Sequence, residues 1–177
     1  MTPSLCTLFA EYNRTMNVRL YEAAARVSAE ELIKERGAFF GSLFNTMNHI
    51  MVGDLLWLHR FATLPALSSL QVELSALPRP ASLREPLAES LAGLTVMRTR
   101  VDAATVSLAS LLTDDLLGST LRYTNTAGQR SARNFGLLLH HFFNHQTHHR
   151  GQASTLLFQA GVDIGVTDFV AHIPSEA

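Results

Sequence analysis

Residues 140–152 read HHFFNHQTHHRGQ, and this stretch holds five of the eight histidines in the chain. An α-helix turns by about 100° per residue, so His145 and His149 would point within about 40° of each other. By the same count Leu138 and Leu156 lie between those two directions. The leucines predict that this side of the helix faces the protein interior and that both histidines point into it.

Two histidines in an apolar interior need polar partners, and a divalent metal is one such partner. Histidines four residues apart on one helix face can bind the same ion, as in zinc proteases, although the glutamate of the protease motif is absent here. The spacing alone permits two pairs, either His141 with His145 or His145 with His149. Core histidines that are satisfied by hydrogen bonds remain the alternative interpretation.

A third ligand has to come from another helix, since two histidines are too few for a metal site. His49 lies in an apolar stretch at residues 42–61 and is the better candidate. His59 lies about 80° away on the same helix, beside a charged residue, and we expect it to face solvent. We expect His140 and His148 at the surface or in an interface.

The rest of the chain predicts further long helices. Apolar residues recur every three or four positions in four segments, at residues 5–26, 42–61, 87–112 and 132–159. Residues 62–86 hold four of the six prolines and predict a long loop. Alternation around Gly128 indicates a β-hairpin. The sequence therefore predicts an all-α protein, an up-down four-helix bundle with a long loop between helices two and three and a small β-hairpin before helix four.

The composition suits a single domain spanning residues 1–177. The chain is 47% hydrophobic and 16% charged with a net charge of −1, which argues against a nucleic-acid-binding surface. No apolar run reaches the roughly 20 residues of a membrane helix, and the N-terminus lacks the basic segment of a secretory signal. The single cysteine, Cys6, has no disulfide partner within the chain and is expected to be buried. We therefore expect a cytoplasmic protein.

Several motifs resemble the DinB-like family, and together they span essentially the whole chain. Residues 46–50 (TMNHI), followed by Asp54 and Trp57, resemble its second helix, and residues 145–152 (HQTHHRGQ) resemble its fourth-helix signature. The hairpin segment at residues 121–134 matches in order and position. The resemblance implies a four-helix bundle with a three-histidine site for a divalent metal, with zinc or nickel as the usual ion.

The resemblance also implies which histidines are ligands. It selects His145 and His149 as the pair on the fourth helix and His49 as the third ligand, and it leaves His141 as a neighbour. Asp54 is a weaker candidate for orienting a ligating histidine, because it lies about 140° away from His49 on the helix.

The remaining residues of the fourth-helix motif are harder to assign. Arg150 is expected to pair with an acid such as Asp54 or Glu11 or, as the simpler interpretation, to be a solvated surface residue. Gly151 and Gln152 have no catalytic role that the sequence indicates.

Three classes of function follow. Relatives of this fold include thiol-dependent transferases and isomerases, which implies a metal-dependent enzyme with a low-molecular-weight thiol, such as bacillithiol or mycothiol, or another small molecule as its partner. A non-catalytic stress-response module, in which the metal mainly holds helices two and four together, is the alternative. The third class is an interaction module, because the high hydrophobic fraction favours a homodimer formed through the first and third helices.

Overall fold

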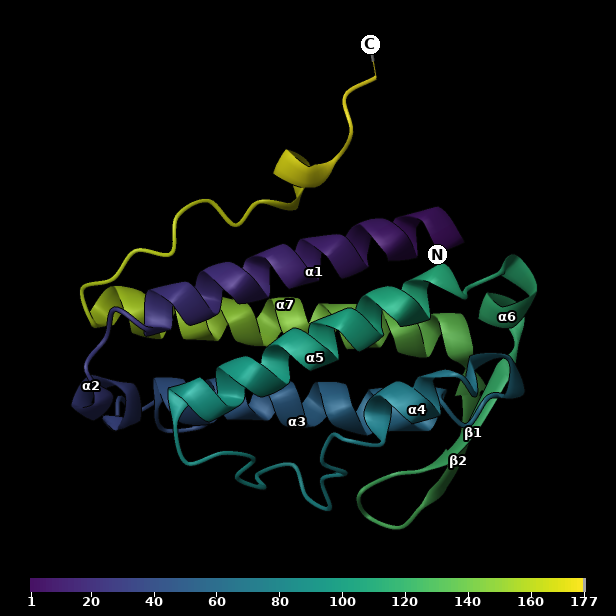
Figure 1. Ribbon diagram of the computed structural model, residues 1–177, viewed down its shortest axis with the longest axis horizontal. Helices are drawn as coiled ribbons and strands as arrows, with labels where there is room; N and C mark the ends of the chain where they lie inside the picture. The colour runs from purple at the N-terminus through teal and green to yellow at the C-terminus, as the bar shows by residue number, and fades with distance from the viewer. Residues whose placement is uncertain (177) are drawn as a thin grey trace.

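The computed structural model of the chain describes residues 1–176 and is mostly helical (Figure 1). Within these residues there are seven α-helices, two short 3-10 helices and one two-stranded antiparallel sheet. The four long helices are α1 (Pro3–Ala24), α3 (Leu43–Phe61), α5 (Leu91–Ser110) and α7 (Phe135–Gln159). The prediction of a mainly helical protein with a small hairpin is confirmed.

The short elements lie in the connections between the long helices and in the C-terminal tail. They are α2 (Ala29–Ile33), a 3-10 helix (Pro65–Leu67), α4 (Leu70–Leu74), α6 (Asp114–Gly118), β1 (Thr120–Thr124), β2 (Arg130–Asn134) and a second 3-10 helix (Phe169–His172). The loop expected at residues 62–86 is therefore interrupted by two short helices. It also places Leu83 and Arg84 around the same cavity as residues of α3.

Capping side chains determine where the long helices begin. The hydroxyls of Ser42 and Ser90 and the side-chain oxygen of Asn134 each accept a hydrogen bond from the backbone N–H three residues further on. Such caps satisfy N–H groups that no helical hydrogen bond reaches. For this reason α5 begins after Ser90 rather than at residue 87. α7 begins after Asn134 rather than at residue 132, because residues 132–134 still belong to β2.

The hairpin forms where the alternating residues predicted it. Its strands pair antiparallel from Thr120 with Asn134 to Thr124 with Arg130. The turn between them includes Gly128 at a φ of +77°, a conformation that side chains other than glycine rarely adopt. The hairpin contacts the start of α7, so it is attached to the helix that contains most of the histidines.

Each long helix packs against two others. α1 lies against α5 and α7, and α3 lies against the same two helices (Figure 1). The core between them consists mainly of leucine and aromatic side chains, and the Phe61 ring packs edge-on against Phe135 and Phe142 at 5.2 and 5.8 Å between ring centroids. In the part of the chain that the structure describes, no helix has an apolar stretch long enough to span a membrane.

The side of α7 that faces the core differs from the predicted one. The most buried line of residues runs through Gln146, which is 0% exposed and lies about 80° away from the direction of Leu138 and Leu156. His145 and His149 are therefore at the edge of the buried side and remain partly exposed. The prediction that both point directly into the core is wrong, because the buried side of α7 is centred on Leu139, Gln146 and Leu157 rather than on Leu138 and Leu156.

A buried polar layer (Asn17, Asp54, Arg98 and Asp102) connects three of the long helices. Arg98 of α5 donates a hydrogen bond to Asp54 of α3 at 2.5 Å and forms a salt bridge with Asp102 at 2.9 Å. Asn17 of α1 donates to Asp102 at 2.8 Å. Within residues 1–176 the hydrogen-bond partner of the Asp54 carboxylate is Arg98, so Asp54 does not orient a site histidine.

Arg150 is also buried, which corrects the expectation of a surface residue. It is 6% exposed, and its guanidinium donates to the side-chain oxygens of Asn13 and Gln146. Within residues 1–176 it forms no salt bridge with Asp54 or Glu11. The sequence did not reveal this position because Asn13 lies on another helix and because Gln146 and Arg150 lie away from the predicted apolar direction of α7.

The C-terminal segment runs back along α1 (Figure 1). The Tyr12 hydroxyl donates to the carbonyl of Thr167 at 2.7 Å, and the Phe9 ring stacks on Phe169 at 4.6 Å between centroids. The segment that follows α7 therefore covers part of α1.

Candidate metal centre

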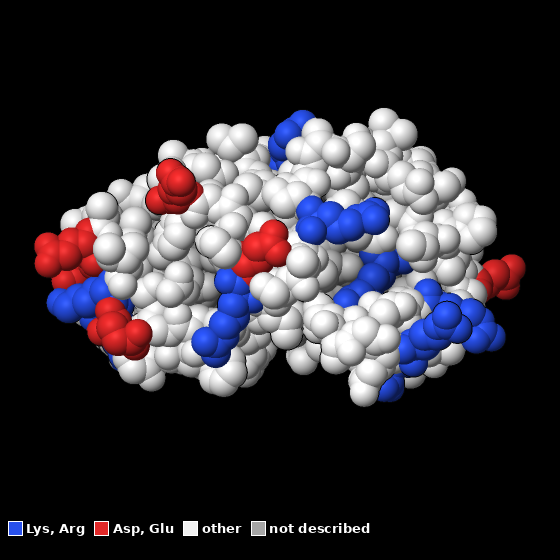
Figure 2. Space-filling view, turned by 90° about the horizontal axis from the view of Figure 1, so that it is seen from below, with Lys and Arg blue, Asp and Glu red and all other residues white. Residues whose placement is uncertain are grey.

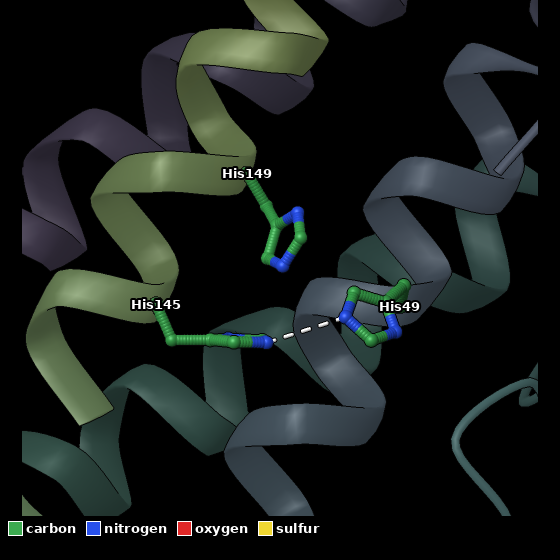
Figure 3. Close-up of side chains that lie close together, drawn as sticks. All are labelled: His49, His145 and His149. Atoms are coloured by element: carbon green, nitrogen blue, oxygen red, sulfur yellow. Dashed lines mark hydrogen bonds between the residues drawn. The ribbon is translucent and has the colours of Figure 1, made fainter. Parts of the chain in front are cut away.

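Three histidines from two long helices meet on one side of the molecule. His49 lies near the first third of α3, and His145 and His149 lie one turn apart on α7. All three side chains point toward one another (Figure 3). One nitrogen from each ring lies within 4.8 Å of the other two, and Nε2 of His49 is 3.2 Å from Nε2 of His145. The structure thus brings together the three histidines that the sequence selected.

The spacing of two of these nitrogens fits a shared metal ion. Zinc binds histidine nitrogens at about 2.0–2.1 Å, so two ligands of a tetrahedral ion are about 3.3 Å apart. The 3.2 Å between His49 and His145 agrees with this value. Three imidazoles from two helices are also the donor set of open metal sites, in which other positions remain for water or a substrate.

Two contacts fix the orientation of the ligand rings. Nδ1 of His49 donates to the backbone carbonyl of Leu83 at 3.1 Å, and Nδ1 of His149 donates to the side-chain oxygen of Gln152 at 2.7 Å. The Nε2 atom of each ring is therefore directed away from these partners and toward the centre of the group. Contacts of this kind hold metal ligands in place and make them better donors. Gln152, for which the sequence indicated no role, thus positions a site histidine.

Gly53 is a second residue whose importance the sequence did not reveal. It lies one turn after His49 on α3, directly under the ring of His145. A methyl group at this position would be 2.6 Å from Cε1 of His145, which is closer than real contacts allow. Glycine at residue 53 therefore lets the ring of His145 lie against α3. Spacing of glycines in helices carries no such signal, because the partner is on another helix.

Aromatic side chains surround the histidines. The Phe40 ring stacks on His49 at 3.9 Å between centroids with an angle of 21° between the planes. The Trp57 ring meets His141 edge-on at 5.4 Å, further along α3. These contacts reduce the freedom of the imidazoles and shield part of the site from water.

The electrostatics of the site keep the histidines neutral. Burial, together with the neighbouring imidazoles, lowers the pKa of His145 to about 3. Burial also lowers the pKa of His49 and of His149 below the ordinary value. A metal binds the neutral form of imidazole. At neutral pH these histidines are already neutral, so none has to be deprotonated before a metal binds.

The other histidines lie outside the group. His141 contacts the same cavity, but its ring centroid is 6.0 Å from that of His145. His140 and His148 are exposed, as expected. His59 is partly buried rather than fully solvated, and its Nε2 lies 3.0 Å from the carbonyl of Pro78.

The group lines an open cavity of ≈ 510 Å³. Its lining is formed by α3, α7, the turn of the hairpin and two loop segments at residues 39–40 and 83–84. The volume is in the range of small-molecule sites. An ion held by the three histidines would therefore have one side open to a bound molecule.

Comparison with known proteins gives one match. The sequence model of the DinB family matches residues 1–176, that is, all of the described chain. No curated protein and no solved structure matches.

Proposed function

The chain belongs to the DinB family, and from this membership and the geometry of its three histidines we propose that it is a divalent-metal-binding enzyme. In this proposal His49, His145 and His149 are the metal ligands. The main support is that their ring nitrogens converge on the wall of an open cavity rather than inside a closed core. Structural metal sites are closed by four protein ligands, whereas catalytic sites keep a position open.

The proposed reaction class is thiol transfer or isomerisation with a low-molecular-weight thiol as cosubstrate. A divalent metal with open positions lowers the pKa of a bound water or thiol toward neutrality. Other residues of this chain orient and shield the site. Leu83 and Gln152 hold the rings of His49 and His149 by hydrogen bonds, and Phe40 covers one side of the site. Zinc or nickel is the proposed ion, since all-imidazole ligation suits both.

The metal content of the protein tests the site. Chain purified without an affinity histidine tag is expected to hold close to one divalent ion per molecule, as measured by elemental analysis. His49→Ala is expected to lose most of the ion, because two histidines are too few. His140→Ala removes an exposed histidine of α7 that lies outside the group, and this variant is expected to retain the ion. A wild-type content far below one ion, with stability unchanged by a chelator, contradicts the site.

A second measurement tests the chemistry. The metal-loaded protein is titrated with a panel of low-molecular-weight thiols and electrophiles. Thiol binding that is lost in His49→Ala, in a protein that still unfolds cooperatively, supports an enzyme. The absence of both binding and turnover across the panel contradicts the thiol-transferase proposal.

A non-catalytic metal module is the second candidate, and one observation favours it. The proposed ligands come from α3 and α7, so a metal would hold two long helices together. Such coupling would raise the stability of the whole chain strongly. A large fall in melting temperature in His49→Ala, without any ligand that binds the wild type, would support this candidate.

We also propose the finer features expected from the sequence: an up-down bundle as a single domain, a cytoplasmic location and a homodimer. For the homodimer, the support is a groove of ≈ 930 Å³ between α1 and α5, whose lining includes the exposed Val18 and the partly buried Val106. Size-exclusion chromatography with light scattering distinguishes a dimer from a monomer.

A further inference from the structure

Two arginines face the cavity beside the three histidines. Arg60 lies at the end of α3, and Arg84 lies in the loop before α5. Neither guanidinium has a salt bridge within residues 1–176, although Arg14, Arg36 and Arg98 all pair with acids. The cavity lining described above includes no aspartate or glutamate. The cavity therefore holds positive charge that the described chain does not neutralise.

Aromatic rings hold both arginines in place. The Arg60 guanidinium lies 4.8 Å from the ring centroid of Trp57 and 5.2 Å from that of Tyr123. The Arg84 guanidinium lies 5.7 Å from the ring of Phe39. A cation over an aromatic face loses part of its mobility. Burial also lowers the pKa of Arg60 below its ordinary value, because the charge is partly desolvated without a carboxylate nearby.

The spacing on α3 places the histidine site and Arg60 at the two ends of one wall. His49, Gly53, Trp57 and Arg60 follow one another at intervals of four, four and three residues, and so they share one face of the helix. Their backbone positions span about 16 Å from His49 to Arg60, at about 1.5 Å per residue. Between them lie Gly53 and the Trp57 ring, which make the middle of the wall apolar.

The charged residues on this side of the molecule are unevenly distributed. In Figure 2 most Lys and Arg lie on the half of this face nearer the hairpin and most Asp and Glu lie toward the opposite end, although each end also carries side chains of the other sign. An uncompensated cation in a cleft attracts anions and raises their local concentration.

We propose that this cavity binds a small carboxylate with an apolar body, whose acid group is held by Arg60 and whose body lies against Trp57. The proposal deepens the proposed function, since the three histidines line the same cavity as Arg60. A guanidinium matches a carboxylate through two parallel hydrogen bonds, which a neutral group of the same shape cannot replace. Arg84 adds positive potential at the histidine end and thereby favours anions over neutral molecules.

Calorimetry with a matched pair of probes tests the proposal. The zinc-loaded chain of residues 1–177 is titrated with 4-phenylbutyrate and with its neutral amide, 4-phenylbutyramide. The acid is expected to bind at least about tenfold more tightly, as one charge-assisted pair allows. Arg60→Gln is expected to remove this preference, and Arg133→Gln, which changes an exposed arginine of the hairpin outside the cavity, is expected to keep it. Equal binding of acid and amide by the wild type overturns the proposal.

A carboxylate can also bind a metal directly, and a second experiment separates the two cases. The titrations are repeated with chelator-treated protein. A preference for the acid that persists there and disappears in Arg60→Gln supports the proposal. A preference that depends on the metal and survives in Arg60→Gln overturns it. The role of Arg60 is judged from the chelator-treated protein. The test of the carboxylate site therefore does not depend on whether the histidines bind a metal.

Folding of the variant is checked in the same series. Circular dichroism reports whether Arg60→Gln retains its helices. Arg60→Lys keeps the charge but loses the planar fork, and it is expected to bind the acid with intermediate affinity. If Arg60→Lys and Arg60→Gln both retain the full preference, Arg60 does not hold the acid.

Discussion

Gly53 and Gly151 show how differently two helical glycines can act. Gly53 lies under the ring of His145 with no space for a methyl group, whereas an added Cβ at Gly151 has no neighbour within 4 Å. Both residues lie within long helices, where glycine is unfavourable relative to alanine by about 1 kcal/mol. At Gly53 this cost is offset by the close approach of a site histidine. At Gly151 the structure shows no such compensation.

Gly53→Ala and Gly151→Ala are therefore expected to differ in their effects on metal binding and on stability. Gly53→Ala displaces the His145 ring and is expected to weaken metal binding by about tenfold or more, the loss typical when the positioning of a ligand is disturbed. Gly151→Ala is expected to leave metal binding unchanged and to raise the free energy of unfolding by up to about 1 kcal/mol. Metal titration and urea unfolding of both variants provide the measurement. Unchanged metal affinity in Gly53→Ala would show that the contact is unimportant.

At this scale the sequence predicted which three histidines come together but not the residues that hold them in place. His145 and His149 could be selected because their spacing and the adjacent Arg-Gly-Gln motif resemble a known pattern. Gln152 lies three residues after His149 on the same helix, a spacing at which helix side chains meet, but the sequence did not show that it contacts His149. Gly53 could not be selected, since its role depends on the rotation of α7 against α3. That rotation is a property of packing between helices, which a pattern within one helix does not contain.

At the scale of helices, the extents were predictable and the rotation of α7 was not. Capping residues such as Ser42 and apolar periodicity determine extents locally. The rotation depends on Gln146 and Arg150, polar residues in the middle of the buried side. Arg150 is acceptable there because its guanidinium donates to the side-chain oxygens of Gln146 and of Asn13 of α1. Leu138 and Leu156, which guided the prediction, lie toward the edge of the buried side.

The buried polar layer makes a second prediction at this scale. Arg98→Ala leaves Asp54 and Asp102 without their cation and is expected to lower the free energy of unfolding by about 3–5 kcal/mol, as is usual when a buried pair loses one partner. Arg100→Ala, two residues further on at the surface, is expected to change it by no more than about 0.5 kcal/mol. Urea unfolding of both variants measures the difference. Similar small effects in both would mean that the layer does not connect the helices energetically.

At the scale of the whole molecule, the lowered pKa of the site histidines links stability to pH. In the unfolded chain these imidazoles have the ordinary value of 6.5, whereas burial lowers the pKa of His145 to about 3 in the folded chain. The unfolded state therefore binds more protons as the pH falls through 6.5. The contribution of His145 to stability is present above that pH and is lost progressively between 6.5 and about 3.

Buried acids have the opposite effect on the pH dependence of stability. The test therefore compares the wild type with a variant that lacks His145. Burial raises the pKa of Asp54 to about 6, which favours the folded chain as the pH falls. Chelator-treated wild type and His145→Asn are compared by urea unfolding at a series of pH values from 8 to 5. The wild type is expected to lose more stability on acidification than the variant. Parallel curves would show that His145 is not kept neutral by the fold.

The whole-molecule features visible in the sequence were those that depend on composition. The high hydrophobic fraction and low charge indicated a buried core, and the prolines indicated the long connection at residues 62–86. The cavity was not predictable, because its walls come from segments as distant as residues 39–40 and the turn at residues 125–126. Only the fold brings these segments together around α3.

The facing ring nitrogens of His49 and His145, 3.2 Å apart, determine where protons reside on the two rings. The carbonyl of Leu83 can only accept, so a neutral His49 keeps its proton on Nδ1 and presents a lone pair at Nε2. The hydrogen bond between the rings then requires the proton of His145 on Nε2. A metal needs the lone pairs of both Nε2 atoms. Metal uptake thus requires a change of tautomer at His145, in which its proton moves to Nδ1 while the ring stays neutral and releases no proton to solvent.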